Sequence, residues 1–73
     1  MHLSQMKEND TAVIKKIEQG SDFARRFFDM GFVEGNEVKC LNIGLKGTPI
    51  AYLICGSKIA LRKKDASRIR VIM

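Results

Sequence analysis

A short amphipathic helix embedded among strand-like segments is the feature that most constrains the fold of this 73-residue chain. Ser21 is a favourable N-cap, and Asp22 falls in the first turn, where the helix dipole favours negative charge. At about 100° per residue, one continuous apolar arc contains Phe23, Ala24, Phe27, Phe28 and Met30. The opposite side carries Arg25, Arg26 and Asp29. Gly31 stands where a left-handed C-cap is expected, so the pattern predicts a helix that ends there and leaves Phe28, at the edge of the arc, partly exposed.

Short runs rich in β-branched residues surround this helix, and such residues favour strands. In the run at residues 12–17, a strand would turn Ala12, Ile14 and Ile17 inward. Lys15 and Lys16 would then lie at a bulge or at the rim. Further strands are expected at residues 37–43, 50–55, 58–61 and 68–72. Turns or loops are expected at residues 34–36, 44–49 and 56–57, with a short helical turn at 62–67.

About five short strands and one early helix in so short a chain indicate a mainly β protein built as a small closed barrel. Closure would remove the sheet edges on which small proteins aggregate. A chain of this length buries roughly 60% of its unfolded surface, so residues 1–73 are expected to form a single domain. No apolar run approaches the ~20 residues that a membrane helix needs, and residues 1–10 contain no stretch typical of a signal peptide. We therefore expect a cytoplasmic protein without direct membrane insertion.

The positive charge of the chain is concentrated at its C-terminal end. Residues 1–56 carry seven basic and seven acidic side chains, whereas residues 57–73 carry six basic side chains against Asp65 alone. The whole net charge of +5 therefore belongs to the last seventeen residues. A solvated rim is one interpretation. The other is a docking face for an acidic protein, a nucleic acid or a membrane surface.

The residue types that carry catalysis are sparse in this chain. The only histidine, His2, lies at a terminus expected to fray, so Ser, Thr or Cys nucleophiles lack a base. Cys40 and Cys55 form no C-x-x-C motif, and two thiolates without further ligands make a poor zinc or iron site. We expect two reduced, half-buried core thiols, because a cross-strand disulfide is disfavoured in a reducing compartment. These observations predict no enzymatic activity, no cofactor and no metal site.

Binding of RNA or DNA by the C-terminal basic cluster is the alternative function for a small basic barrel. Barrels that bind single strands stack bases on exposed aromatic side chains set among Lys and Arg. Here the phenylalanines surround the predicted helix, and only Tyr52 could bridge them to the basic cluster. Nucleic acid is therefore the less favoured partner.

Two motifs give the chain a family resemblance. The first runs from Asp22 to Phe32 and contains a pair of arginines, two large apolar residues, Asp-Met-Gly and another apolar residue. The second is Gly56-Ser-Lys-Ile-Ala-Leu-Arg62, and the turn Gly47-Thr48-Pro49-Ile50 precedes it in the same order. This set resembles the FeoA family, the small cytosolic proteins of bacterial ferrous iron transport. The chain departs from the family pattern by lacking a proline before Gly35 and by a residue 43–49 loop that is one residue longer.

The resemblance extends over about residues 3–71 and carries expectations of its own. It implies an SH3-like barrel with the helix inserted after the first strand. It also implies an accessory or regulatory role in iron homeostasis, with FeoB, the membrane ferrous iron transporter that has a cytosolic GTP-hydrolysing domain, as the partner. The same barrel occurs as the C-terminal domain of metal-dependent repressors. This chain has no helix-turn-helix segment, so we do not expect a free-standing repressor.

Two surfaces are predicted to contact that partner. The first comprises Arg25, Arg26, Phe28, Met30 and Phe32, and the second comprises Arg62, Lys63 and Lys64. Phe23, Phe27 and Met30 also fit a role in the core, and the arginine pair could simply solvate the helix. Docking that adjusts GTP-driven activity or assembly is the main hypothesis, and an arginine acting in trans on GTP is the alternative. Self-association and the direction of regulation stay open.

Overall fold

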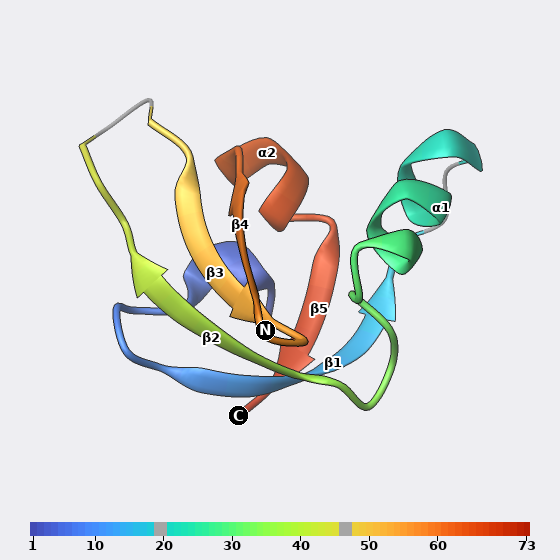
Figure 1. The fold of residues 1–73 in the computed structure, drawn as a ribbon, viewed down its shortest axis with the longest axis horizontal. Coiled ribbons are helices and arrows are strands. Elements are labelled where there is room, and N and C mark those ends of the chain that lie inside the picture. The colour runs from blue at the N-terminus through green and yellow to red at the C-terminus, as the bar shows by residue number, and fades with distance from the viewer. Residues whose placement is uncertain (19–20, 46–47) are drawn as a thin grey trace.

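The computed structural model describes residues 1–18, 21–45 and 48–73, with the backbone alone at residues 21–23. Five antiparallel strands form one sheet in the order β4-β3-β2-β1-β5 (Figure 1). The elements along the chain are η1 (Leu3–Gln5), β1 (Thr11–Ile17), α1 (Ser21–Asp29), β2 (Glu37–Asn42), β3 (Ile50–Ile54), β4 (Ser57–Leu61), α2 (Lys63–Ala66) and β5 (Ile69–Ile72). The predicted mainly β architecture, with the helix inserted after the first strand, is confirmed.

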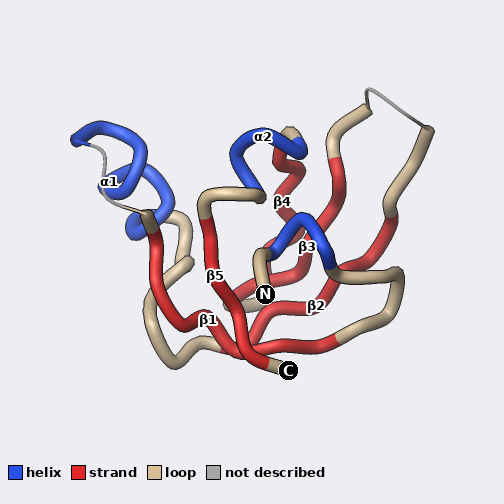
Figure 2. Tube along the Cα trace, turned by 180° about the vertical axis from the view of Figure 1, so that it is seen from behind, coloured by secondary structure: helices blue, strands red, loops and turns tan. Residues whose placement is uncertain are grey.

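The sheet curls around the core, and its two edge strands are connected through α2 (Figures 1 and 2). Among the described residues the hydrogen-bonded order ends at β4 on one side and at β5 on the other. The 3-10 helix η1 packs against α2 and β5. The expected closure is therefore completed by short helices, because strand pairing alone does not join β4 to β5.

The first strand has the pattern predicted for it. Ala12 and Ile14 are buried, and the register against β5 shifts between Ile14 and Lys16. This bulge inserts one extra residue, so Lys15 and Lys16 are both exposed and Ile17 returns toward the core. Two adjacent cations thereby face solvent without disturbing the buried side of the sheet.

The N-terminus is tied to the last strand, contrary to the expectation that it frays. His2 forms an isolated bridge with Arg70, and the Val71 N–H donates to the Met1 carbonyl over 2.8 Å. Leu3 is completely buried, and its carbonyl accepts a hydrogen bond of 3.2 Å from the Tyr52 hydroxyl. Sequence patterns missed this segment because it is held by long-range contacts and has no periodicity of its own.

Gly31 ends α1 and turns the chain back toward the core. Its φ of +104° lies in the left-handed region, as the predicted C-cap requires. The Phe32 N–H then donates to the Phe27 carbonyl over 2.9 Å, and the two rings meet edge to face with centroids 5.6 Å apart. A Cβ at Gly31 would also lie 3.0 Å from the Cys55 sulfur, so this position combines a conformational and a steric need for glycine.

Two local expectations need a comment. The predicted turn at residues 56–57 lies one residue earlier, because Cys55 (φ 50°) and Gly56 (φ 76°) form it and Ser57 already pairs with Ile54. This pair of left-handed residues matches the type I′ geometry that two-residue hairpins favour. The roles predicted for the side chains of Ser21, Asp22 and Phe23, and for Lys46 and Gly47 in the loop, fall outside the described residues.

Truncation of the two neighbouring phenylalanines should separate the core face of α1 from its exposed edge. Phe27 is 1% exposed and Phe28 is 61% exposed. Phe27→Ala should lower the free energy of unfolding by about 3–5 kcal/mol because it leaves a cavity, enough to unfold a domain of this size. Phe28→Ala should cost less than about 1 kcal/mol. Urea unfolding followed by circular dichroism measures both, and equal losses would contradict this assignment of faces.

Alanine substitutions at Gly31 and Gly35 test the close contact between Gly31 and Cys55 at the end of α1. Gly35→Ala should cost roughly 1–2 kcal/mol from the left-handed backbone alone, since φ is +94° and a Cβ added at this position would meet no atom within 4 Å. Gly31→Ala should cost more, because the new methyl group meets Cys55. In the Gly31→Ala background, adding Cys55→Ala should restore the additional free energy of unfolding that was lost. In the Gly35→Ala background, the same change should restore none. A double-mutant cycle of unfolding free energies measures this coupling.

Candidate partner-binding surface

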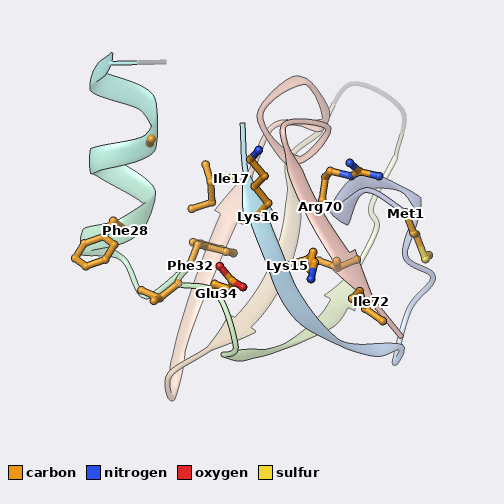
Figure 3. Close-up of a pocket in the computed structure, with 12 residues that line it drawn as sticks. Met1, Lys15, Lys16, Ile17, Phe28, Phe32, Glu34, Arg70 and Ile72 are labelled. Atoms are coloured by element: carbon orange, nitrogen blue, oxygen red, sulfur yellow. The ribbon is translucent and has the colours of Figure 1, made fainter. Parts of the chain in front are cut away.

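A groove of about 750 Å³ separates α1 from β1 and β5 (Figure 3). We call it the α1 groove. Phe28 lies at its helix side, while Met1 and Ile72 lie at the opposite side. These three side chains are 61%, 45% and 54% exposed. Large apolar groups left in solvent around a concave surface are typical of an interface that another molecule covers.

Basic side chains line the same groove between its apolar ends. Lys15 and Lys16 come from the bulge of β1, and Arg70 comes from β5. Lys16 pairs directly with Arg70 across the two strands, an arrangement of like charges that destabilises a sheet. Glu34 is the acidic residue of the lining, and Glu18 lies beside the cation pair in an adjoining hollow. An anionic group supplied from outside would relieve the repulsion within this pair.

The structure divides the first predicted surface. Phe28 and Ala24, one turn apart on α1, face the α1 groove. Arg25 and Arg26 are exposed but do not line it, and the Arg26 guanidinium lies 6.0 Å from the centre of the Phe27 ring. Met30 is half-buried and packs against the core. The helix therefore presents its aromatic edge, and not its arginine pair, to the groove.

Phe32 is a correction to that surface. Its side chain is 0% exposed, because the turn at Gly31 directs the ring onto Phe27. A fully buried ring cannot be a direct contact for a partner, although it supports the groove from beneath. The sequence placed it beyond the helix end and gave no local sign of which way the chain turned.

The second predicted surface gains neighbours from a distant loop. Arg62, Lys63 and Lys64 are all exposed at α2 and its start. Arg62 and Lys63 share a hollow of about 650 Å³ with Ile43 and Leu45 of the β2–β3 loop. These two apolar residues were not among the predicted contacts, because only the fold brings residues 43–45 beside residues 62–63.

Both cysteines are free, but they are not the pair of half-buried thiols that was expected. Cys40 is fully buried opposite Tyr52, and burial raises the pKa of its thiol, to which the charges of Glu8 and Asp10 add. Cys55 is exposed in the β3–β4 turn, where the Asn36 amide donates to its sulfur over 3.4 Å. Within the described residues, no three His, Cys, Asp or Glu side chains lie close enough to share a metal ion.

The side chains that the nucleic-acid alternative needs are mostly buried. Tyr52 is 0% exposed, and burial raises the pKa of its hydroxyl, so it cannot bridge aromatics to the basic end. Phe27 and Phe32 are buried as well. Of the aromatic side chains that the structure describes, Phe28 alone is available for stacking, which is little for a barrel that binds single strands.

Arg70, Met1 and Ile72 are among the groove residues that sequence reasoning missed. They reach the site because the two ends of the chain meet beside β1. The alternation of β5, in which the exposed Arg70 and Ile72 follow the buried Ile69 and Val71, was the available signal. In the described part of the chain, no helix is long and apolar enough to span a bilayer.

Comparison with known proteins places these features in a family. The FeoA domain model matches residues 1–73. The Fe(2+) transport protein A/Fe(2+) transporter FeoB fusion protein of Porphyromonas gingivalis is 34% identical over 71 residues, which is 97% of this chain but 8% of the fusion protein. The chain thus spans a small fraction of that curated relative.

Two solved structures have the same fold over nearly the whole chain. Iron(II) transport protein A from Clostridium thermocellum superposes with a TM-score of 0.93 at 33% identity, covering 100% of this chain and 45% of that one. The zinc complex of FeoA from Stenotrophomonas maltophilia, described as a prokaryotic SH3 domain protein, gives 0.86 at 31% identity over 97% of this chain and 88% of that one. With a family match along its whole length and these structural relatives, the chain belongs to the FeoA family.

Proposed function

We propose that this chain is a non-enzymatic accessory and regulatory protein of bacterial ferrous iron uptake, which works in the cytoplasm by docking on the GTPase portion of FeoB. The observation that carries the proposal is the fusion of a related domain to FeoB in Porphyromonas gingivalis. Fusion keeps two proteins at a high effective concentration, an arrangement that benefits proteins that act together. Where the two are separate chains, a docking surface would serve the same purpose.

The α1 groove is the surface we assign to this docking. It joins an exposed aromatic anchor, Phe28, to apolar side chains at the opposite side and to three cations between them. Aromatic, Met and Arg side chains are enriched at protein interfaces, where a few of them carry most of the binding energy. The cross-strand pair of Lys16 and Arg70 favours a partner with an acidic contact.

Docking is a better account than an arginine acting in trans on GTP. Arg25, Arg26 and Arg62 are the candidates for that role, and they lie on two elements, the first two on α1 and Arg62 directly before α2. An arginine that reaches into a nucleotide site must be positioned for the transition state. The Arg26 guanidinium lies 6.0 Å from the centre of the Phe27 ring on its own helix.

Calorimetric titration against the isolated cytosolic domain of FeoB tests the docking proposal. Binding should be measured with a GTP analogue, with GDP and without nucleotide. Phe28→Ala should weaken binding by about tenfold or more, because an aromatic anchor is lost while the fold is kept. Binding that depends on nucleotide identifies a regulator that responds to the GTPase state, and binding independent of nucleotide identifies an adaptor.

Leu53→Ala is the control for this titration. Leu53 is 39% exposed on β3 and lies outside the groove, so its truncation should leave the affinity unchanged. Absence of wild-type binding in all three nucleotide states would overturn docking on the GTPase portion. If Phe28→Ala and Leu53→Ala weakened binding equally, docking itself would stand, but the α1 groove would not be the docking surface.

GTP hydrolysis by that domain separates docking from catalysis by an arginine. The triple variant Arg25→Ala/Arg26→Ala/Arg62→Ala should retain any effect of the chain on the hydrolysis rate, because none of the three guanidinium groups lines the α1 groove. An arginine in the nucleotide site is worth about 10³–10⁵ in rate, so its loss would be unmistakable. A collapse of stimulation in the triple variant would favour catalysis in trans.

A further inference from the structure

The loop between β2 and β3 carries an apolar group that nothing in the fold covers. Leu45 is 83% exposed, more than any other large apolar side chain of the described residues, and Ile43 is 37% exposed. Both line the hollow that also contains Arg62 and Lys63. Figures 1 and 2 place α2 and the described parts of this loop at the same end of the molecule. Leu45, Ile43, Arg62, Lys63 and Lys64 are together called the loop–α2 surface.

The charge of this surface is strongly positive. Arg62, Lys63 and Lys64 are consecutive and exposed, and among the described residues that line the hollow beside Arg62 and Lys63 none is acidic. Asp65 lies in α2 and is half-buried. On the other side of the loop, a Glu8 carboxylate oxygen accepts a hydrogen bond of 3.2 Å from the Ile43 N–H. The three cations therefore outnumber the carboxylates around them.

Several backbone groups in the described part of the loop are hydrogen-bonded, which lowers the cost of placing them in an apolar environment. The Gly44 N–H donates to the Asn42 side-chain oxygen over 3.0 Å. The Leu45 carbonyl accepts from the Thr48 N–H over 3.0 Å and also from the Thr48 hydroxyl. Unsatisfied backbone groups are what excludes most loops from the edge of a bilayer. This loop therefore offers its apolar side chains without that penalty at these groups.

The helix α2, which carries two of the three cations, is packed against the core. Ala66 is 0% exposed, so α2 is anchored in the core through its last residue. The Ser67 N–H donates to the Lys63 carbonyl over 3.0 Å, which closes the turn that carries the basic side chains. The backbone that carries the cations is thus fixed beside the loop. The apolar side chains and the cations of the loop–α2 surface can therefore contact the same external surface.

We propose that the loop–α2 surface binds the anionic surface of a lipid bilayer, with Leu45 and Ile43 at the level of the headgroups and Arg62, Lys63 and Lys64 on the lipid phosphates. The argument is charge complementarity combined with exposed apolar side chains, the two signals on which reversible peripheral binding depends. Contact at this depth is shallow and leaves the expected lack of membrane insertion unchanged. Because the α1 groove uses other residues, the chain can contact a bilayer and a protein partner at once.

Flotation with lipid vesicles tests this inference with the protein alone. The chain should bind vesicles that contain phosphatidylglycerol and should not bind phosphatidylcholine vesicles. Binding should weaken as salt shortens the screening length. Each cation near an anionic surface contributes about fivefold in affinity, so Lys63→Glu/Lys64→Glu should abolish binding. Leu45→Ser should weaken binding several-fold and keep its salt dependence.

A second patch of the protein supplies matched controls. On β3, Leu53 is 39% exposed, and its cross-strand partners are Lys39 and Lys58. Leu53→Ser and Lys39→Glu/Lys58→Glu repeat the same chemistry elsewhere and should leave vesicle binding close to wild type apart from the change in net charge. No binding to anionic vesicles at low salt would overturn the inference. Equal losses from the control variants would overturn it too, by showing that net charge alone attracts the chain.

Discussion

The antiparallel pairing of β1 with β5 is the interaction on which the rest of the structure depends. It joins the start of the chain to its end, and the N-terminal residues extend the same edge through the bridge of His2 with Arg70. With α2 and η1 at the opening, this pairing completes a core around Tyr52 and Leu3. It also creates the floor of the α1 groove, because Lys16 and Arg70 become neighbours only when the two strands pair. The stability of the core and the proposed binding surface thus depend on the same pairing.

The end of α1 is the second constraint, and it connects local and long-range structure. Gly31 allows the reversal that drives Phe32 onto Phe27, and its missing side chain leaves space for Cys55 of a different hairpin. Asn36 donates to the Gly31 carbonyl over 2.8 Å and also reaches the Cys55 sulfur. The helix is therefore fixed to the sheet at its C-terminal end. Phe28, on the free edge of this fixed helix, gains a defined position without being buried.

The basic character of the chain is distributed over two surfaces with different geometry. The α1 groove is concave and combines cations with Phe28 from a helix and Ile72 from a strand. The loop–α2 surface combines three consecutive cations with the exposed apolar side chains of Ile43 and Leu45. A concave cationic groove fits a protruding acidic protein element, whereas exposed apolar side chains beside a run of cations fit a broad anionic surface. For a protein proposed to act beside a membrane transporter, the two are compatible.

The individual helices and strands could be predicted from the amino-acid sequence, because their signals are local. The apolar arc and Gly31 specify α1, and the alternation interrupted by Lys15 and Lys16 specifies β1 with its bulge. The exposure of Phe28 followed from its place on that arc, and motif order was enough for the family. Only the tertiary structure decided which distant residues share a surface, as when Arg70 joined Lys16 through strand pairing. Local periodicity reports which side of an element faces the core, whereas a binding surface is assembled from the outward sides of several elements, and their relative placement appears only when the whole chain has folded.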